Sequence, residues 1–397
     1  MTPPLSSPLK KEFLDKKLRL VQDTMKQQEI DLWITFTREG NEDPLAPDLR
    51  FDNITWRSAA LIDRNLNKTA LVGSLEEEAI KQRGFYDQVI PYASEGASPK
   101  LKQIIARMKP KKIALNKSYD EGAADGLTSS MEAYLKKALQ GIKTEYVSSE
   151  DLAIALRARL IPEEVNLVKR AIQECEKVYD EIETIIRPGK KDRDIFQYAH
   201  QLVDQRNLEY AWAKDHCPSV VVGNSPAGHV AYYGDTIHKG DFVRLDFGVK
   251  YQGYCSDIQR NYIVGPTTIP AGVKKMFQVA REANDIALKN LKPGVQGYKI
   301  DQLARSHITK NGFAEYKHAL GHVLGRSTHE IGPLLGPRWS NRYGNQPMKT
   351  VMKDLVFTIE PSVTSRYGTC NLEQDVLVTT NSYRDLSKPQ TELIMVG

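Results

Sequence analysis

The sequence predicts an α+β protein of two domains, the second of which is built from two related α/β halves. The chain has 397 residues, more than one ordinary hydrophobic core accommodates. Strand-like runs alternate with helical patterns through its first part, and a stretch that starts at residue 187 recurs 105 residues later. We therefore expect an amino-terminal domain over residues 1–158 and a larger domain over residues 159–397.

The first domain is predicted to be a small α/β unit. Apolar residues recur at helical spacing over residues 14–25. The strand-like runs that follow are 31–36, 58–63, 69–73 and 112–116. The second and third of these runs are expected to pair with each other. Further helical patterns cover residues 74–83 and 148–160, and such alternation is typical of an α/β domain.

The second domain is predicted to begin with a long helix. Pro162 suits the first turn of a helix, and Glu163 and Glu164 complement the positive end of the helix dipole. The helical pattern continues to about Ile186 and ends at the sequence "RPG".

An internal repeat starts at that "RPG". "RPGKKDRDIFQYAHQLVDQRNLE" (187–209) aligns with "KPGVQGYKIDQLARSHITKNGFA" (292–314) at a constant offset of 105 residues. A long helical pattern precedes each copy, and apolar β-type runs follow it. Residues 162–385 are therefore predicted to form two related α/β halves packed into one domain.

Composition excludes several classes of protein. Hydrophobic residues make up 41% and charged residues 26%, as in soluble globular proteins, and no run of eighteen apolar residues predicts a membrane span. The start "MTPPLSSPLKKEF" lacks an apolar signal region, so a cytoplasmic location is expected. The net charge of +5 is spread along the chain, which disfavours nucleic-acid binding, and the four cysteines are too dispersed for a zinc knuckle.

Two aspartates interrupt apolar runs in "DFVRLDFGVKYQGYCSDIQR" (241–260). A hairpin with Tyr251 and Gln252 at its tip places Asp246 opposite Asp257. Cross-strand neighbours lie only ~5 Å apart at Cβ, so the two carboxylates would repel each other unless a cation lay between them. The alternative interpretation moves the tip and lets one aspartate face water.

The second half adds imidazoles and further carboxylates. "HALGHVLGRSTHEIGP" (318–333) holds three histidines among glycines that allow close backbone approach. Glu360 lies in the β-type run "LVFTIEPSV", and Glu373 lies at the start of "NLEQDVLVTT". Taken singly, each has an ordinary explanation as a buried ion pair, a core histidine or a strand-end charge. Together they place carboxylates and imidazoles in apolar strands with too few buried lysines or arginines to neutralise them.

Charge balance favours a metal centre. Four ionised carboxylates match the charge of two divalent cations, whereas one zinc ion would leave charge unmatched. Oxygen-rich ligation with one imidazole suits Mn²⁺, and Co²⁺, Fe²⁺ and Zn²⁺ are also compatible with this set of ligands.

The ligand-type residues resemble those of the pita-bread metallopeptidases, which include methionine aminopeptidase, aminopeptidase P and prolidase. Their order along the chain is Asp246, Asp257, His322, Glu360 and Glu373. The aspartates are eleven residues apart, and His322 precedes His329 by seven. The resemblance covers roughly residues 160–385 and implies a pita-bread catalytic domain of two pseudo-symmetric halves.

The resemblance also implies a role for each ligand. Asp246 would bind one metal ion, His322 and Glu360 the other, and Asp257 and Glu373 would bridge them. Water held between two ions ~3.5–4 Å apart is a nucleophile near neutral pH.

Further roles implied by the resemblance concern proton transfer and the substrate. Glu360 doubles as the proton shuttle between the water and the leaving nitrogen. His229 matches the family's first-half substrate histidine, His329 the one that stabilises the tetrahedral intermediate, and His318 a further substrate-side histidine.

The amino-terminal domain distinguishes members of this group. Methionine aminopeptidases have at most a short extension, whereas prolidases, aminopeptidases P and creatinase carry an α/β domain of this size. Creatinase lacks the metal set. The resemblance therefore implies a homodimeric Xaa-Pro aminopeptidase or dipeptidase, which cuts a peptide between its first residue and a following proline.

Three residues depart from the usual family sequence. Gln259 stands where threonine is usual, Asn371 where proline-specific members often have arginine, and Ser362 where glycine is common. One alternative is therefore a metallo-aminopeptidase or amide hydrolase of the same fold without proline specificity. A non-catalytic pita-bread binding protein is a further alternative, which the presence of all five ligand types disfavours.

Overall fold

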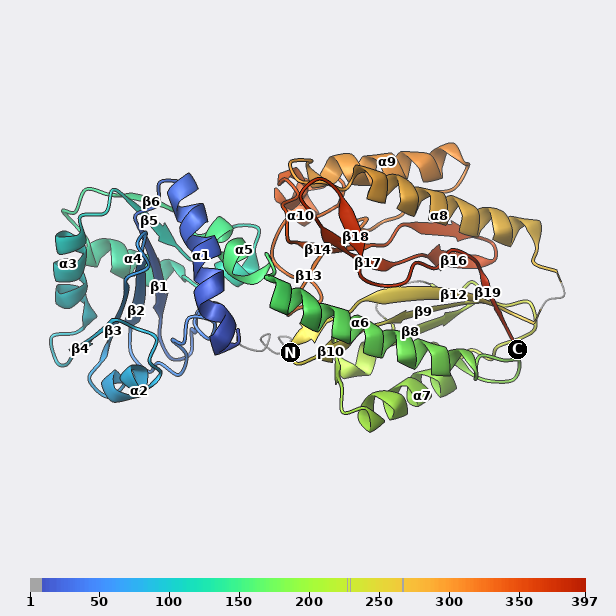
Figure 1. The fold of residues 1–397 in the computed structure, drawn as a ribbon, viewed down its shortest axis with the longest axis horizontal. Helices are drawn as coiled ribbons and strands as arrows, with labels where there is room; N and C mark the ends of the chain where they lie inside the picture. The colour runs from blue at the N-terminus through green and yellow to red at the C-terminus, as the bar shows by residue number, and fades with distance from the viewer. Residues whose placement is uncertain (1–8, 227, 229, 266–267) are drawn as a thin grey trace. The chain divides into compact units, whose positions relative to one another are not determined.

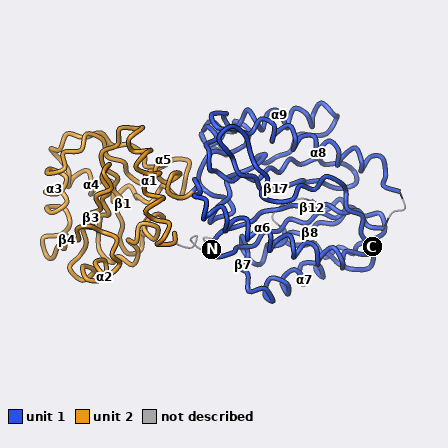
Figure 2. The backbone as a smooth tube through the Cα atoms, in the orientation of Figure 1, with its two compact units in different colours: residues 1–6, 158–397 blue, residues 7–157 orange. Residues whose placement is uncertain are grey.

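The computed structural model describes residues 9–226, 228, 230–265 and 268–397. Residues 158–397 form one compact unit, and the described residues up to Arg157 form another (Figure 2). No helix among the described residues is both long and apolar enough to cross a bilayer.

The amino-terminal unit is built on one six-stranded sheet. Its strands are β1 Leu32–Thr37, β2 Ser58–Asp63, β3 Lys68–Gly73, β4 Gln88–Tyr92, β5 Lys112–Leu115 and β6 Glu145–Ser148. Its helices are α1 Lys11–Gln27, α2 Glu77–Gln82, α3 Ala97–Met108, η1 Gly122–Ala124, α4 Ser129–Ala138 and α5 Glu150–Arg157. The strand order is β4-β3-β2-β1-β5-β6, in which β2 runs antiparallel to both neighbours and the outer pairs are parallel.

The elements predicted for this unit are present. The four strand-like runs form β1, β2, β3 and β5, and the pairing expected between the second and third is confirmed as antiparallel. The helical patterns form α1, α2 and α5. Sequence patterns did not predict β4, which contains Pro91 and lies at a sheet edge, or the short, half-exposed β6.

A buried carboxyl group lies in the core of the amino-terminal unit. Asp43 is 1% exposed and accepts hydrogen bonds from the Leu45 backbone N–H (2.9 Å) and from Asn116 Nδ2 (2.8 Å). The Asn116 carbonyl in turn accepts from Trp33 Nε1 at 2.7 Å. Burial raises the pKa of Asp43 to about 7 despite these hydrogen bonds, which lower it.

This pKa predicts a pH-dependent stability. Between pH ~4 and ~7 the folded protein binds a proton at Asp43 that the unfolded chain releases, so the free energy of unfolding falls as the pH rises. Asparagine at position 43 does not ionise, so the free energy of unfolding of Asp43→Asn should not fall in this way. As the pH rises from ~4 to ~7, the stability of the variant relative to wild type should therefore increase by about 1 kcal/mol or more. Urea unfolding at a series of pH values checks this, with Asp23→Asn on the exposed face of α1 as control. A constant difference between wild type and Asp43→Asn would contradict the prediction.

The second unit contains two halves that follow each other in sequence. The first half comprises α6 Pro162–Glu183, α7 Asp192–Gln205, β7 Glu209–Tyr210, η2 Lys214–His216, β8 Ser219–Val222, β9 Phe242–Phe247, β10 Val249–Tyr251, β11 Tyr254–Cys255 and β12 Ile258–Val264. The second half comprises α8 Ala271–Asn290, α9 Gly297–Lys310, β13 Val323–Leu324, α10 Ser340–Tyr343, η3 Gln346–Met348, β14 Val356–Ile359, β15 Ser362–Ser365, β16 Gly368–Asn371, β17 Gln374–Val378, β18 Tyr383–Asp385 and β19 Ile394–Val396.

The predicted repeat corresponds to equivalent helices. Both α7 and α9 have 14 residues, and they begin at Asp192 and Gly297, at the offset of 105 residues that the sequence alignment predicts. Gly189 and Gly294, at the same offset, adopt positive φ angles of 88° and 86° in the turns that precede these helices. The repeat is therefore confirmed as two halves with matching helix pairs.

The strands of this unit lie between the two helix pairs. Figure 1 shows α6 and α7 on one side of the strands and α8 and α9 on the other. The strand orders are β11-β10-β7, β19-β12-β9-β8, β13-β14-β17-β18 and β15-β16. One apolar cluster joins α6 and α7 to the inner face of β8, β9 and β12. The opposite face of β9 and β12 is left to carry polar side chains.

The register predicted for the first-half hairpin is wrong by two residues. Lys250 pairs with Cys255, so the tip is Gln252–Gly253 rather than Tyr251–Gln252. Both tip residues have positive φ, 48° and 87°, as the twist-matched two-residue turn requires, and glycine adopts such angles readily. A shift of two residues preserves which face each side chain occupies.

Candidate metal centre

Strand β9 presents the first-half site residues on the face away from α6. Val243, Leu245 and Phe247 pack in the apolar core, so the alternating residues Arg244 and Asp246 face the opposite side. The neighbours of Asp246 across the sheet are Ser219 on β8 and Gln259 on β12. Asp246 therefore lies opposite Gln259, and not opposite Asp257 as the predicted register had it.

Asp257 lies between β11 and β12 and is held by the second half of the unit. Its backbone N–H donates to the Asp375 carboxylate at 3.2 Å, and both residues are buried. Asp257 precedes Gln259 by two residues, so their side chains share one face of the strand. This arrangement brings Asp257 and Asp246 to the same face.

Glu360 and Glu373 occupy a break in the second-half strands. The pairs Ile359–Gln374 and Ser362–Asn371 have the same register, so the two glutamates lie opposite each other between them. Glu360 was predicted within a β-type run and Glu373 at the start of one, and the structure places them at the junctions β14–β15 and β16–β17. Pro361 follows Glu360 and has no N–H to continue the ladder.

Helix α8 closes this break with one side chain. Asn284 is fully buried, and its Nδ2 donates to the carbonyl oxygens of Ile359 at 3.0 Å and Leu372 at 3.4 Å. These carbonyls belong to the residues directly before Glu360 and Glu373. Asn284 therefore fixes the backbone from which both glutamates project.

His322 reaches the carboxylates from the segment before β13. Its backbone N–H donates to Thr358 Oγ1 at 3.2 Å, and a Cβ on the preceding Gly321 would lie 2.0 Å from the Thr358 carbonyl oxygen. Only glycine allows this close approach. His322 Nδ1 donates to the Val323 carbonyl (3.3 Å), which leaves the lone pair on Nε2.

The His322 Nε2 atom faces two carboxylates. It lies 3.7 Å from Asp257 Oδ2 and 3.6 Å from Glu360 Oε1. Ligand atoms of Asp257, His322 and Glu373 all lie within 4.8 Å of one another. The structure thus brings together residues from both halves that the sequence singled out separately.

The electrostatics of the cluster are unfavourable without a cation. Burial raises the pKa of Asp257 and of Glu373 well above the ordinary values, and the neighbouring carboxylates raise both further. Burial and Asp246 likewise raise the pKa of Glu360, while burial lowers that of His322. Both carboxylate oxygens of Glu373 are buried and accept no hydrogen bond from the described residues. Oxygen donors, one imidazole and this excess of negative charge fit divalent metal ions.

Two of the three other predicted histidines, His318 and His329, lie among the described residues. The His329 ring lies 4.3 Å from that of His322, centroid to centroid. His318 donates from Nδ1 to the Ala319 carbonyl at 2.7 Å, and burial lowers its pKa to about 4, so its imidazole is neutral. His229, the predicted first-half substrate histidine, lies outside the described residues.

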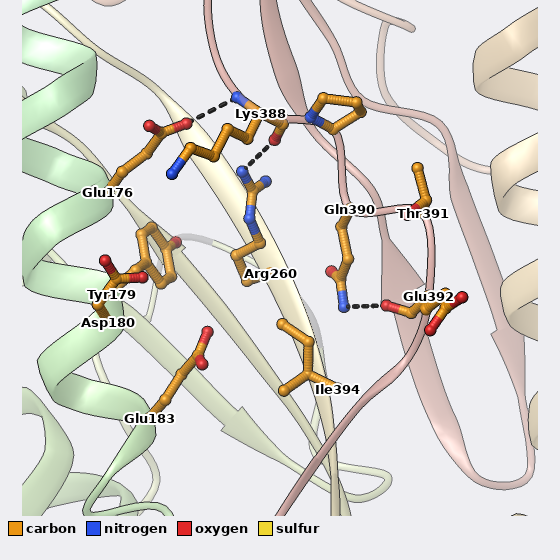
Figure 3. A pocket seen from close by; sticks show the side chains of 11 residues that line it. Glu176, Tyr179, Asp180, Glu183, Arg260, Lys388, Gln390, Thr391, Glu392 and Ile394 are labelled. Atoms are coloured by element: carbon orange, nitrogen blue, oxygen red, sulfur yellow. Dashed lines mark hydrogen bonds between the residues drawn. The ribbon is translucent and has the colours of Figure 1, made fainter.

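Two buried residues that the sequence analysis did not select support the cluster. Arg260 donates to the backbone carbonyl of Glu373 at 3.0 Å and to that of Lys388, and it borders a cavity of about 270 Å³ beside α6 (Figure 3). Asp375 orients Asp257, and burial raises its pKa well above the ordinary value. The sequence feature that could have identified Asp375 is its position as an acidic residue at the start of the otherwise apolar run "DVLV".

The three departures from the family sequence all lie at the site. Gln259 Nε2 donates to Glu360 Oε2 at 3.3 Å, which lowers the Glu360 pKa against the effect of burial. Ser362 Oγ donates to Asn371 Oδ1 at 2.9 Å across the β15–β16 ladder. Two of the departures therefore form one buried hydrogen-bonded pair.

We predict that Asn284→Ala weakens the break that carries both glutamates. Loss of the amide removes two buried hydrogen bonds, to the carbonyls of Ile359 and Leu372, and should lower the free energy of unfolding by about 1–3 kcal/mol. It should also weaken metal binding, since second-sphere changes typically cost ~10–100-fold in affinity. Urea unfolding and metal titration of the chelator-treated protein measure both effects. Asn290→Ala on the same helix, whose amide donates to the Ile286 carbonyl at 2.8 Å, is the matched control. Equal metal affinity in wild type and Asn284→Ala would contradict the prediction.

The sequence is similar to a known protein family and to several known proteins. Residues 166–380 match metallopeptidase family M24. An uncharacterised peptidase of Bacillus subtilis is 30% identical over 237 residues, which cover 59% of this chain and 63% of that protein. An Xaa-Pro dipeptidase of Pyrococcus horikoshii is 29% identical over 255 residues, covering 63% of this chain and 68% of that protein. The match to the Bacillus relative thus spans less than two thirds of its length.

Solved structures show the same fold. An Xaa-Pro dipeptidase from Bacillus anthracis has a TM-score of 0.70 at 23% identity, covering 96% of this chain and all of that one. A prolidase from Pyrococcus horikoshii has a TM-score of 0.65 at 24% identity, with the same coverage of both chains. These likenesses confirm the predicted fold, a pita-bread domain preceded by a smaller α/β domain.

Proposed function

The chain belongs to metallopeptidase family M24, and from this we propose that it is a metal-dependent Xaa-Pro aminopeptidase or dipeptidase. The observation that carries the proposal is the convergence of buried Asp257, His322 and Glu373, whose potential ligand atoms all lie within 4.8 Å of one another. Two relatives are themselves Xaa-Pro dipeptidases, which supports a peptide substrate with proline in second position.

We propose that the cluster holds two divalent metal ions, with Mn²⁺ as the resident metal. The ligands would be Asp246, Asp257, His322, Glu360 and Glu373. Two divalent cations balance the four carboxylates, and the donor set is dominated by oxygen. When bound, such ions supply Lewis acidity and make water a nucleophile near neutral pH.

Glu360 is proposed to move the protons of the reaction. Its side chain is 17% exposed, whereas that of Asp257 is 8% exposed, so substrate and solvent reach Glu360 more readily. Its Oε2 accepts from Gln259 and its Oε1 faces His322. A carboxylate in this position can accept a proton from the attacking water and deliver it to the leaving nitrogen.

The histidines are proposed to bind the substrate. His329 lies against His322 and is assigned to the carbonyl oxygen that gains negative charge during attack. Neutral His318 can accept a hydrogen bond at Nε2, because its Nδ1 already donates to Ala319. We assign His229 to the substrate as well, from its match to the family sequence.

A second candidate function keeps the chemistry and drops the requirement for proline. It is favoured by Asn371, which replaces an arginine common in proline-specific members and is bonded to Ser362. A panel of dipeptides that differ only in their second residue separates the candidates. Hydrolysis of Ala-Pro alone supports the first, and equal hydrolysis of Ala-Ala supports the second.

The assembly and location of the protein are also proposals. The family resemblance implies a homodimer, and we propose this assembly for the present chain. We likewise propose a cytoplasmic location. Sedimentation of the purified protein and fractionation of cells test the two statements.

We predict that chelation abolishes Xaa-Pro hydrolysis and that Mn²⁺ or Co²⁺ restores it, because the carboxylate cluster has no activity of its own. Glu360→Gln should lower kcat by about 10²–10⁴-fold, since it removes the group that transfers protons. His322→Ala should lower both metal content and kcat. Rates on Ala-Pro, together with elemental analysis, measure these effects.

The controls for these variants lie outside the cluster. Glu392→Gln and the exposed His238→Ala should behave as wild type. Undiminished hydrolysis of Ala-Pro by His322→Ala and Glu360→Gln would overturn the proposed function.

A further inference from the structure

Arg244 is a buried cation inside the proposed catalytic site. It is 4% exposed and lies two residues before Asp246 on the same face of β9. Its Nε and Nη2 atoms are buried and make no hydrogen bond within the part of the chain that the structure describes. The sequence indicates too few buried lysines or arginines to neutralise the carboxylates, and Arg244 is a buried arginine that it did not identify.

The strand neighbours of Arg244 do not satisfy its guanidinium. On one side lies the apolar Val221. On the other lies Asn261, whose amide donates to the Asn371 carbonyl at 2.7 Å and accepts from the Asn371 N–H at 3.2 Å. Donors left unpaired in a buried guanidinium cost free energy, so a partner from outside the chain is expected to complete this group.

The charge of the site indicates what that partner is. Two divalent ions would already neutralise the four carboxylates. Arg244 then adds one positive charge, and burial lowers its pKa while Asp246, Glu373 and Glu360 raise it. An arginine stays ionised in proteins, and its planar fork of N–H groups matches a carboxylate. The missing group is therefore an anion with the geometry of a carboxylate.

We propose that Arg244 binds the carboxylate at the carboxyl end of the substrate, which makes this enzyme a dipeptidase rather than an aminopeptidase acting on longer peptides. The inference rests on the proposed function and deepens it. In a dipeptide, three bonds separate the scissile carbonyl carbon from the carboxylate carbon, a distance of at most about 4 Å. Arg244 and Asp246 are about 7 Å apart along β9, a span that the arginine side chain bridges.

Longer peptides lack this interaction. In a tripeptide the same carbon belongs to a neutral amide, which accepts a hydrogen bond but brings no negative charge. The guanidinium would then remain buried without a counter-ion. Discrimination between dipeptides and longer peptides would follow directly from one side chain.

The experiment compares Ala-Pro with its carboxamide, Ala-Pro-NH₂, on the Mn²⁺-loaded full-length protein. Wild type should hydrolyse Ala-Pro with a kcat/KM about 10–100-fold above that for the amide, as expected for a hydrogen-bonded charge pair. Arg244→Met should raise KM for Ala-Pro and abolish this preference while leaving the amide rate nearly unchanged. Arg244→Lys, which keeps the charge without the fork, should lie between them. Arg384→Met, an exposed strand arginine, is the matched control.

Two outcomes separate this inference from the proposed function. If Arg244 only balances the carboxylates, Arg244→Met will slow both substrates equally and change the metal content, and the inference fails while the peptidase assignment stands. If wild type cleaves neither substrate, the proposed function fails. Calorimetry with an Ala-Pro analogue whose peptide bond is reduced, and with its carboxamide, then tests Arg244 without turnover. Equal affinity of wild type for the two analogues would overturn the inference.

Discussion

The mutual repulsion of buried carboxylates is the constraint on which the catalytic unit depends. Asp257, Glu360 and Glu373 are removed from water and placed within a few ångströms of one imidazole, which favours their protonated forms. Folding alone does not repay such an arrangement. The rest of the domain therefore serves to hold the oxygens in place until cations compensate their charge.

The two halves share this task through backbone contacts. Asn284 binds the carbonyls that precede both glutamates, Arg260 binds the Glu373 carbonyl from β12, and Asp375 binds the N–H of Asp257. In the last two contacts, one half anchors a proposed ligand residue that the other half supplies. Since these contacts hold Asp257, Glu360 and Glu373 through their main chain, the side-chain oxygens of these proposed ligands stay available for metal.

Periodicity and residue spacing were enough to predict four of the six strands of the first sheet, the repeated helices and the residues that cluster around His322. They did not predict the hairpin register, because the turn at Gln252–Gly253 depends on positive φ angles that many residues disfavour. They also missed Asp375 and Arg244, since a single charge in an apolar strand has the same appearance whether it faces water or a buried site. Family resemblance drew attention to Gln259, Ser362 and Asn371, but only the coordinates show that the last two contact each other.

The Ser362–Asn371 hydrogen bond couples the side chains at two positions of this chain. Glycine at position 362 alone would leave the side-chain oxygen Oδ1 of Asn371 without its donor. Arginine at position 371 alone would leave the Ser362 hydroxyl without its acceptor. Either single change removes the same buried hydrogen bond, so the effects of the two changes on stability are expected to be non-additive. Asn261 bonds to Asn371 and is the strand neighbour of Arg244. An arginine introduced at position 371 would therefore lie near the buried Arg244. Arg244 is thus expected to disfavour a second buried arginine at position 371.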